Sequence, residues 1–95
     1  MEVGTEQPTT HGWRWTVSIA WTDADPSDHD VSLSWADHDH LTGGAIAPHR
    51  TAEAVAGVAA GRLGRAALPR RFDASTARRL IGGFDDGVRE FLSLP

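Results

Sequence analysis

Residues 13–22, WRWTVSIAWT, decide the fold, because apolar and polar side chains alternate along the whole stretch. Period two, with aromatic and β-branched residues on one side, predicts a strand with one buried face. The side chains expected on the buried face are Trp13, Trp15, Val17, Ile19 and Trp21.

The alternation resumes in residues 30–37, after the stretch DADPSDHD at 23–30, whose Asp, Ser and Pro residues are typical of turns. Two alternating runs around a turn predict an antiparallel hairpin, 13–22 with 30–37. Pairing Thr22 with Asp30 puts every apolar residue, including Trp35, on one face, and a register two residues away keeps the same faces.

The rest of the chain predicts helices after a weak strand. Residues 41–47, LTGGAIA, are a possible third strand, although two glycines interrupt it. Apolar spacing predicts a helix over about 51–67, begun by Thr51, and a more strongly amphipathic helix over about 74–93, capped by Asp73 or Ser75.

These elements predict an α+β fold, a short antiparallel sheet with both helices on its Trp-bearing face. Residues 1–11 lack any periodicity and are expected to form a flexible N-terminal tail, leaving 12–95 as a single domain. The sheet has open edges in this arrangement, at 13–22 and 41–47, which favour self-association or strand addition.

Composition limits the chemistry. The chain has no cysteine, which removes disulfides, Cys-based metal sites and thiol catalysis. The first residues are acidic and polar, and no uncharged run approaches the roughly 20 residues of a membrane helix. We therefore expect a soluble cytoplasmic protein that does not bind membranes.

The charge is divided unevenly along the chain. Residues 1–47 carry one Arg and eight acidic residues, whereas 48–95 carry eight Arg and five acidic residues. Arg70, Arg71, Arg78 and Arg79 lie around the start of the second helix, where they could bind RNA, ribosomes or an acidic partner. A solvated face is the simpler interpretation, because the net charge of −4 is unlike that of a nucleic-acid binder.

Histidines and aspartates cluster twice, at 28–30 and 37–40. The predicted hairpin separates the two clusters but brings His11 beside Asp39 and His40. His11, His38 and His40, with Asp39 or Asp37, are therefore a candidate site for zinc or another divalent metal. Solvated loop residues are the alternative, and no other cofactor is indicated.

Three features point to contacts with a partner. Trp13 and Trp15 lie near the start of the first strand, where two helices need not cover them. Thr16 and Ser18 belong to a smooth polar face that could pack on a second copy. Gly57 and Gly61 lie one turn apart on the first helix and predict a close approach there, most simply by the sheet or the other helix.

No catalytic or phosphate-binding motif is present. WTVSIAW at 15–21, followed by a short strand and an Ala-rich helix, resembles several small actinobacterial domains of unknown function, some of them likened to ribosome-associated factors. The resemblance assigns no role to any residue. The expected function is a small non-enzymatic interaction or accessory protein, homo-oligomeric or part of a larger complex, with an RNA-associated factor and a metal-binding domain as alternatives.

Overall fold

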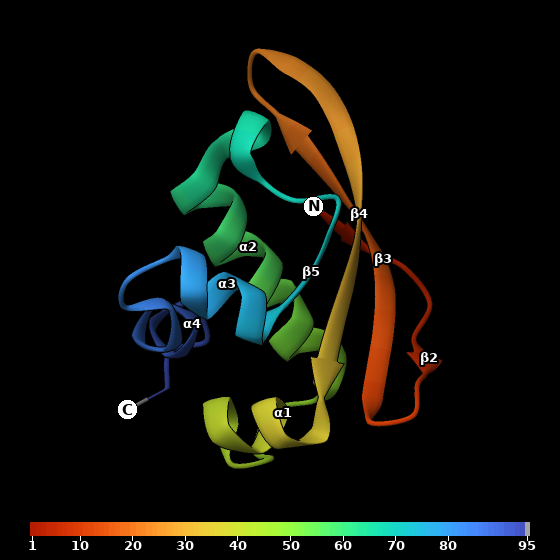
Figure 1. The fold of residues 1–95 in the computed structure, drawn as a ribbon, viewed down its shortest axis with the longest axis vertical. Coiled ribbons are helices and arrows are strands. Elements are labelled where there is room, and N and C mark those ends of the chain that lie inside the picture. Colours follow the sequence, from red (N-terminus) through yellow and green to blue (C-terminus); the bar gives the residue numbers. More distant parts are fainter. Residues whose placement is uncertain (95) are drawn as a thin grey trace.

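A long hairpin of two strands is the centre of the fold (Figure 1). The computed structural model describes residues 1–94 of the chain and confirms a mixed α+β architecture, a five-stranded sheet with four helices. The elements in chain order are β1 Glu2–Val3, β2 Gln7–Pro8, β3 Gly12–Trp21, β4 Ala24–Ser34, α1 Trp35–Thr42, α2 Pro48–Ala67, β5 Arg71–Asp73, α3 Ala74–Leu80 and α4 Phe84–Phe91.

The alternation along β3 builds the core as predicted. Trp15, Val17 and Ile19 are buried on the helix-facing side, opposite a β4 strand that buries Val31 and Leu33. Figure 1 shows the helices gathered on this side of the sheet. None of the helices formed by residues 1–94 lies on the opposite side, so the sheet keeps one open polar face.

The register differs from the predicted one by six residues along β3, because Asp30 pairs with Thr16 and not with Thr22. The chain turns within two residues, Thr22 and Asp23, so most of the stretch expected to be the turn belongs to β4. Pro26 is tolerated there because it lies beside an irregularity of the ladder between Ile19 and Trp21. The shift is even, so the buried and exposed faces are preserved.

The N-terminal residues expected to form a flexible tail instead contribute two short strands. β1 pairs with β3 through Glu2 and Ser18, and β2 pairs with β3 through Gln7 and Arg14. These strands line the edge of β3 that was expected to be open.

The possible third strand at 41–47 is not formed, because Leu41 and Thr42 end a helix and residues 43–47 form a turn and irregular backbone. Residues 35–42 form α1, because the Ser34 hydroxyl accepts a hydrogen bond from the Asp37 amide at 3.0 Å and caps the helix, and because Leu41 is buried. The third long-range partner of the hairpin is β5, which runs parallel to β4 and places Phe72 beside Val31.

The predicted helix over 51–67 is confirmed as α2, which begins earlier, at Pro48. Thr51 does not cap it: its side chain is buried and its hydroxyl donates to the Ala47 carbonyl at 3.2 Å. Gly64, with φ of 76°, kinks the helix near its end.

The predicted helix over 74–93 begins where expected, because the Asp73 side chain accepts from the Thr76 amide at 2.8 Å. It is not continuous. Gly83 adopts a left-handed φ of 70° and separates α3 from α4. The break changes the direction of the chain between the two helices, and the apolar residues Ala77 of α3 and Phe84 and Val88 of α4 are all buried.

The four tryptophans do not share one sheet face. Trp15 is 1% exposed in the core and Trp13 and Trp21 are partly buried, but Trp35 begins α1 and is 55% exposed. The correction follows from the register, since β4 ends at Ser34 before Trp35 can join the sheet. Within residues 1–94, none of the helices has the length and apolar character required to span a membrane.

Candidate interaction surfaces

Helices α2 and α4 approach closely through glycines. A Cβ atom built on Gly57 would lie 2.7 Å from Cε2 of Phe91, and one on Gly87 would lie 3.2 Å from Cγ1 of Val58. Because the earlier α2 position meets the later α4 position, the two helices run antiparallel. The close approach predicted from the glycine spacing is therefore made, at Gly57, with the second predicted helix.

Gly61, one turn further along α2, has no such neighbour. A Cβ built there would meet nothing within 4 Å, and the residue is exposed. The space above it is a groove of about 390 Å³ between α2 and α4. The lining residues are Gly57, Val58, Gly61, Arg62, Gly87, Glu90 and Phe91.

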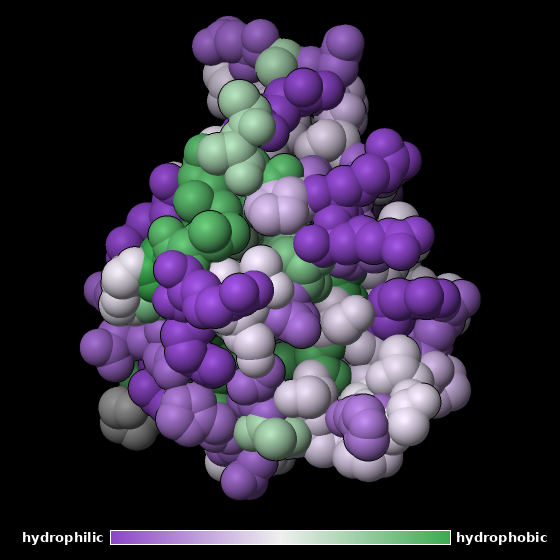
Figure 2. Space-filling model, viewed as in Figure 1, coloured by the Kyte–Doolittle hydropathy of each residue, from purple (hydrophilic) through white to green (hydrophobic). Residues whose placement is uncertain are grey.

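The groove combines apolar walls with a charged rim. Phe91 is 46% exposed and Val58 is only partly buried. Arg62 stands on α2 and Glu90 on α4, and neither forms an ion pair among residues 1–94. Figure 2 shows hydrophobic side chains gathered over the C-terminal half of α2, the helix that supplies one wall.

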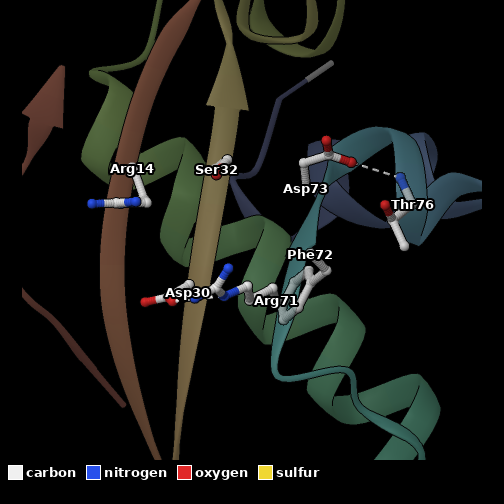
Figure 3. A pocket seen from close by; sticks show the side chains of 7 residues that line it. All are labelled: Arg14, Asp30, Ser32, Arg71, Phe72, Asp73 and Thr76. Carbon is white, nitrogen blue, oxygen red and sulfur yellow. Dashed lines mark hydrogen bonds and ion pairs between the residues drawn. The ribbon is translucent and has the colours of Figure 1, made fainter. Parts of the chain in front are cut away.

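The open sheet face holds a second, polar site of about 300 Å³ (Figure 3). The register arranges its side chains in rows across the strands. The rows that line the site are Arg14–Ser32–Asp73 and Asp30–Arg71, with Phe72 and Thr76 completing the lining.

The charges of this polar site already have partners within the chain. Figure 3 shows the Arg71 side chain reaching from β5 to Asp30, with 3.4 Å between Nε and Oδ2. Arg14 donates to the Gln7 side-chain oxygen at 2.9 Å, and Asp73 caps α3. The site therefore offers little uncompensated charge to a ligand.

The four arginines predicted to bind RNA or an acidic partner lie on different parts of the fold. Arg71 is on the sheet, Arg70 and Arg79 are exposed, and Arg78 is part-buried. Arg78 lies between two carboxylates, with its Nε 2.9 Å from Oδ1 of Asp85 and its Nη1 3.4 Å from Oδ1 of Asp37.

This charge network joins three helices. Burial by itself would raise the pKa of Asp85, but hydrogen bonds from Arg78 and His40 outweigh burial and lower it. Burial likewise opposes the charge of Arg78, yet the hydrogen bond and charge of Asp85 raise the pKa of the guanidinium. Arg89 completes the junction by donating to the carbonyls of His40 and Leu41 at the end of α1.

The histidines of the candidate metal site each have a separate neighbour. His38 Nε2 lies 2.6 Å from the Ile46 carbonyl oxygen, and His40 Nε2 lies 2.9 Å from Asp85. His11 is exposed, and its carbonyl accepts from the Trp35 amide. Asp39 is also exposed. Across residues 1–94, no three His, Cys, Asp or Glu side chains are grouped so that they could hold a metal ion.

The remaining predicted partner residues divide between the two sheet faces. Trp13 and Trp15 face the helices, with ring centroids 6.4 Å apart, and the Trp13 ring meets His38 edge-on. Thr16 is exposed on the open face, and the Ser18 hydroxyl there donates to Asp28 at 2.6 Å.

Sequence reasoning missed Phe91, Glu90 and Gly87 as surface residues, because the uninterrupted stripe assigned to 74–93 placed Phe91 in the core. The paired glycines at 82–83 were the available signal that the helix turns. Comparisons with protein-family models, curated proteins and solved structures found no match for this chain.

Proposed function

We propose that this protein is an interaction module that self-associates through the α2–α4 groove, as an accessory subunit or regulator of a larger assembly. The observation that carries the proposal is Gly61. A glycine inside a helix costs about 1 kcal/mol relative to alanine. At Gly57 the contact with Phe91 accounts for that cost, whereas at Gly61 no contact among residues 1–94 does.

A second copy is the occupant that the groove fits best. In a two-fold arrangement the same patch serves both copies, so whatever projects from one must enter the other. Phe91 lines the groove and is 46% exposed although its ring rests on Gly57, and the missing Cβ of Gly61 leaves room beside it for an aromatic ring of a second copy. Each copy thus supplies both an anchor and a receiving surface.

The charged rim supports the same arrangement. Arg62 and Glu90 lie on opposite walls of one groove and carry opposite charges. A two-fold axis along the groove brings Arg62 of one copy toward Glu90 of the other, twice in each dimer. Complementary charges at the rim of an interface set its register and favour the correct partner.

Sedimentation velocity over a concentration series tests the proposal. The wild-type protein is expected to form a dimer at micromolar concentration, and Gly61→Leu to remain monomeric because the new side chain fills the groove. Ala66→Leu is the matched control, since it adds the same side chain at an exposed α2 position that does not line the groove. A monomeric wild type, or a Gly61→Leu variant that still dimerises, would refute the proposal.

A further inference from the structure

His29 is an exception among the residues that face the helices from the hairpin. Its neighbours on that side of the sheet, Val17 and Val31, are apolar and buried, and His29 itself is only 5% exposed. A buried imidazole needs hydrogen-bond partners for both ring nitrogens. His29 has a partner for each nitrogen, and these partners fix the orientation and the tautomer of the ring.

The ring is oriented by a backbone carbonyl. Nδ1 of His29 lies 2.7 Å from the carbonyl oxygen of Pro69, which can only accept a hydrogen bond. In the neutral ring Nδ1 therefore carries the hydrogen and Nε2 is the free acceptor. Nε2 lies 2.7 Å from Oγ of Ser27, so the serine hydroxyl donates a hydrogen bond to the imidazole.

A third group fixes the serine oxygen. The indole Nε1 of Trp21, which can only donate, lies 2.9 Å from Oγ of Ser27. The Ser27 oxygen thus accepts from Trp21 while its own hydrogen points to His29. Ser27 is therefore hydrogen-bonded to a base, His29, which is in turn oriented by the Pro69 carbonyl. This is the arrangement that activates a hydroxyl as a nucleophile.

The dyad is open to a pocket. Both Ser27 and His29 line a cavity of about 320 Å³ at the side of β4, together with Pro26, Asp28, Arg65, Leu68 and Arg70. The two arginines outnumber the single carboxylate of Asp28. Arg65 is held in place by its hydrogen bond to the Asp25 carbonyl at 2.8 Å.

We propose that Ser27 and His29 are a nucleophile and base for acyl transfer from esters that carry a negative charge. Ser27 Oγ attacks the acyl carbon while His29 Nε2 takes the hydroxyl proton. The bond to the leaving alcohol breaks, and that oxygen takes the proton from His29. Water, deprotonated by His29, then releases the acid from Ser27, so one ester and one water give one acid and one alcohol.

Arg65 and Arg70 define the substrate class. Guanidinium groups bind carboxylate and phosphate in preference to neutral groups. An ester with an anionic acyl chain is therefore expected to show a lower KM than its neutral counterpart, and Arg70→Gln to raise the KM of the anionic ester toward that of the neutral one.

The same hydrogen bonds also tie the segment before β5 to β4, so the test must separate reactivity from stability. Treatment of the wild-type protein with a fluorophosphonate, followed by peptide mapping, measures which hydroxyl reacts. Ser18 and Ser75 are internal controls, because their hydroxyls donate to carboxylates at 2.6 and 3.2 Å and have no imidazole partner.

Ser27 is expected to be labelled at least about a hundredfold faster than Ser18 or Ser75, the low end of what a positioned base contributes. The labelling should be slowed by an anionic p-nitrophenyl ester, which Ser27→Ala should fail to hydrolyse above background. Equal labelling of the three serines in the folded wild type would overturn the proposal, as would full ester hydrolysis by Ser27→Ala.

Discussion

Gly57 lies so close to Phe91 that a Cβ atom on the glycine would stand 2.7 Å from the ring. The same helix carries Gly61, where a Cβ atom would meet nothing within 4 Å. One glycine thus serves a contact within the chain, and the other leaves a surface open. This difference separates the effects of two otherwise identical substitutions.

Gly61→Ala is expected to stabilise the monomer by about 1 kcal/mol, because alanine favours the helix and the added methyl group meets no neighbour. Gly57→Ala gains the same helix propensity but must displace the Phe91 ring, so its net effect is expected to be near zero or destabilising. Urea denaturation at concentrations that keep the chain monomeric measures both. Equal stabilisation by the two substitutions would show that the Gly57–Phe91 contact does not form.

Gly12 is required for a different reason. A Cβ atom there would overlap the Leu33 carbonyl oxygen and lie 2.7 Å from the Cα atom of Ser34. Both neighbours are backbone of the paired strand and have no room to move without opening the sheet. Gly12→Ala is expected to lower the free energy of unfolding by about 2 kcal/mol or more. Thermal unfolding within experimental error of the wild type would contradict the β3–β4 register.

Removing the N-terminal cap of α3 is expected to lower the free energy of unfolding by less than Gly12→Ala does. Asp73→Ala removes the acceptor of the Thr76 amide and is expected to cost about 1 kcal/mol. Asp86→Ala is the matched control, because that carboxylate is 91% exposed and lies 3.6 Å from its Arg89 partner. Urea denaturation of both variants should give a change below about 0.5 kcal/mol for the control.

The charge network predicts a pH-dependent stability. The folded-state pKa of Asp85 lies below its usual 3.8, so the ionised carboxylate stabilises the fold above pH 3.8. That contribution is lost as the pH falls through the folded-state pKa. Asp85→Asn is therefore expected to be less stable than the wild type by about 1–2 kcal/mol at neutral pH.

Chemical denaturation of both proteins at about pH 7 and about pH 3 tests this dependence. The gap between wild type and Asp85→Asn should narrow at the lower pH. A gap that stays constant would mean that Asp85 contributes through its shape and not through its charge.

Local patterns were sufficient to predict the elements that are stabilised by their own sequence. Three such features could be predicted: the alternation of β3, the apolar spacing of α2 and the Asp73 cap. Each depends on neighbours within a few residues. The start of α1 was also available, since Ser34 and Asp37 have the spacing of a helix N-terminus. The alternation through Trp35 outweighed that signal and extended the predicted second strand to residue 37, whereas β4 ends at Ser34.

Long-range pairing was not predictable in the same way. Asp, Ser and Pro at 23–30 favour a turn locally, but the hairpin closes at Thr22 and Asp23, which lets β4 place Val31 opposite Trp15. The junction of Asp37, Arg78 and Asp85 brings Asp37 to Arg78, which lies 41 positions later in the chain, and no local pattern predicts such a long-range contact. The predicted hairpin placed Ser27 and His29 in its turn, whereas both belong to β4 and face the helices, so the Ser27–His29 pair could not be recognised from the sequence.

The groove interface is tested most directly by exchanging its rim charges. Arg62→Glu and Glu90→Arg each place like charges across the two-fold axis, so each variant alone is expected to sediment as a monomer at concentrations where the wild type is dimeric. Mixing the two variants restores opposite charges at both rim positions. Sedimentation velocity of the mixture should therefore recover the dimer, whereas a mixture that stays monomeric, or single variants that dimerise as the wild type does, would contradict self-association through α2 and α4.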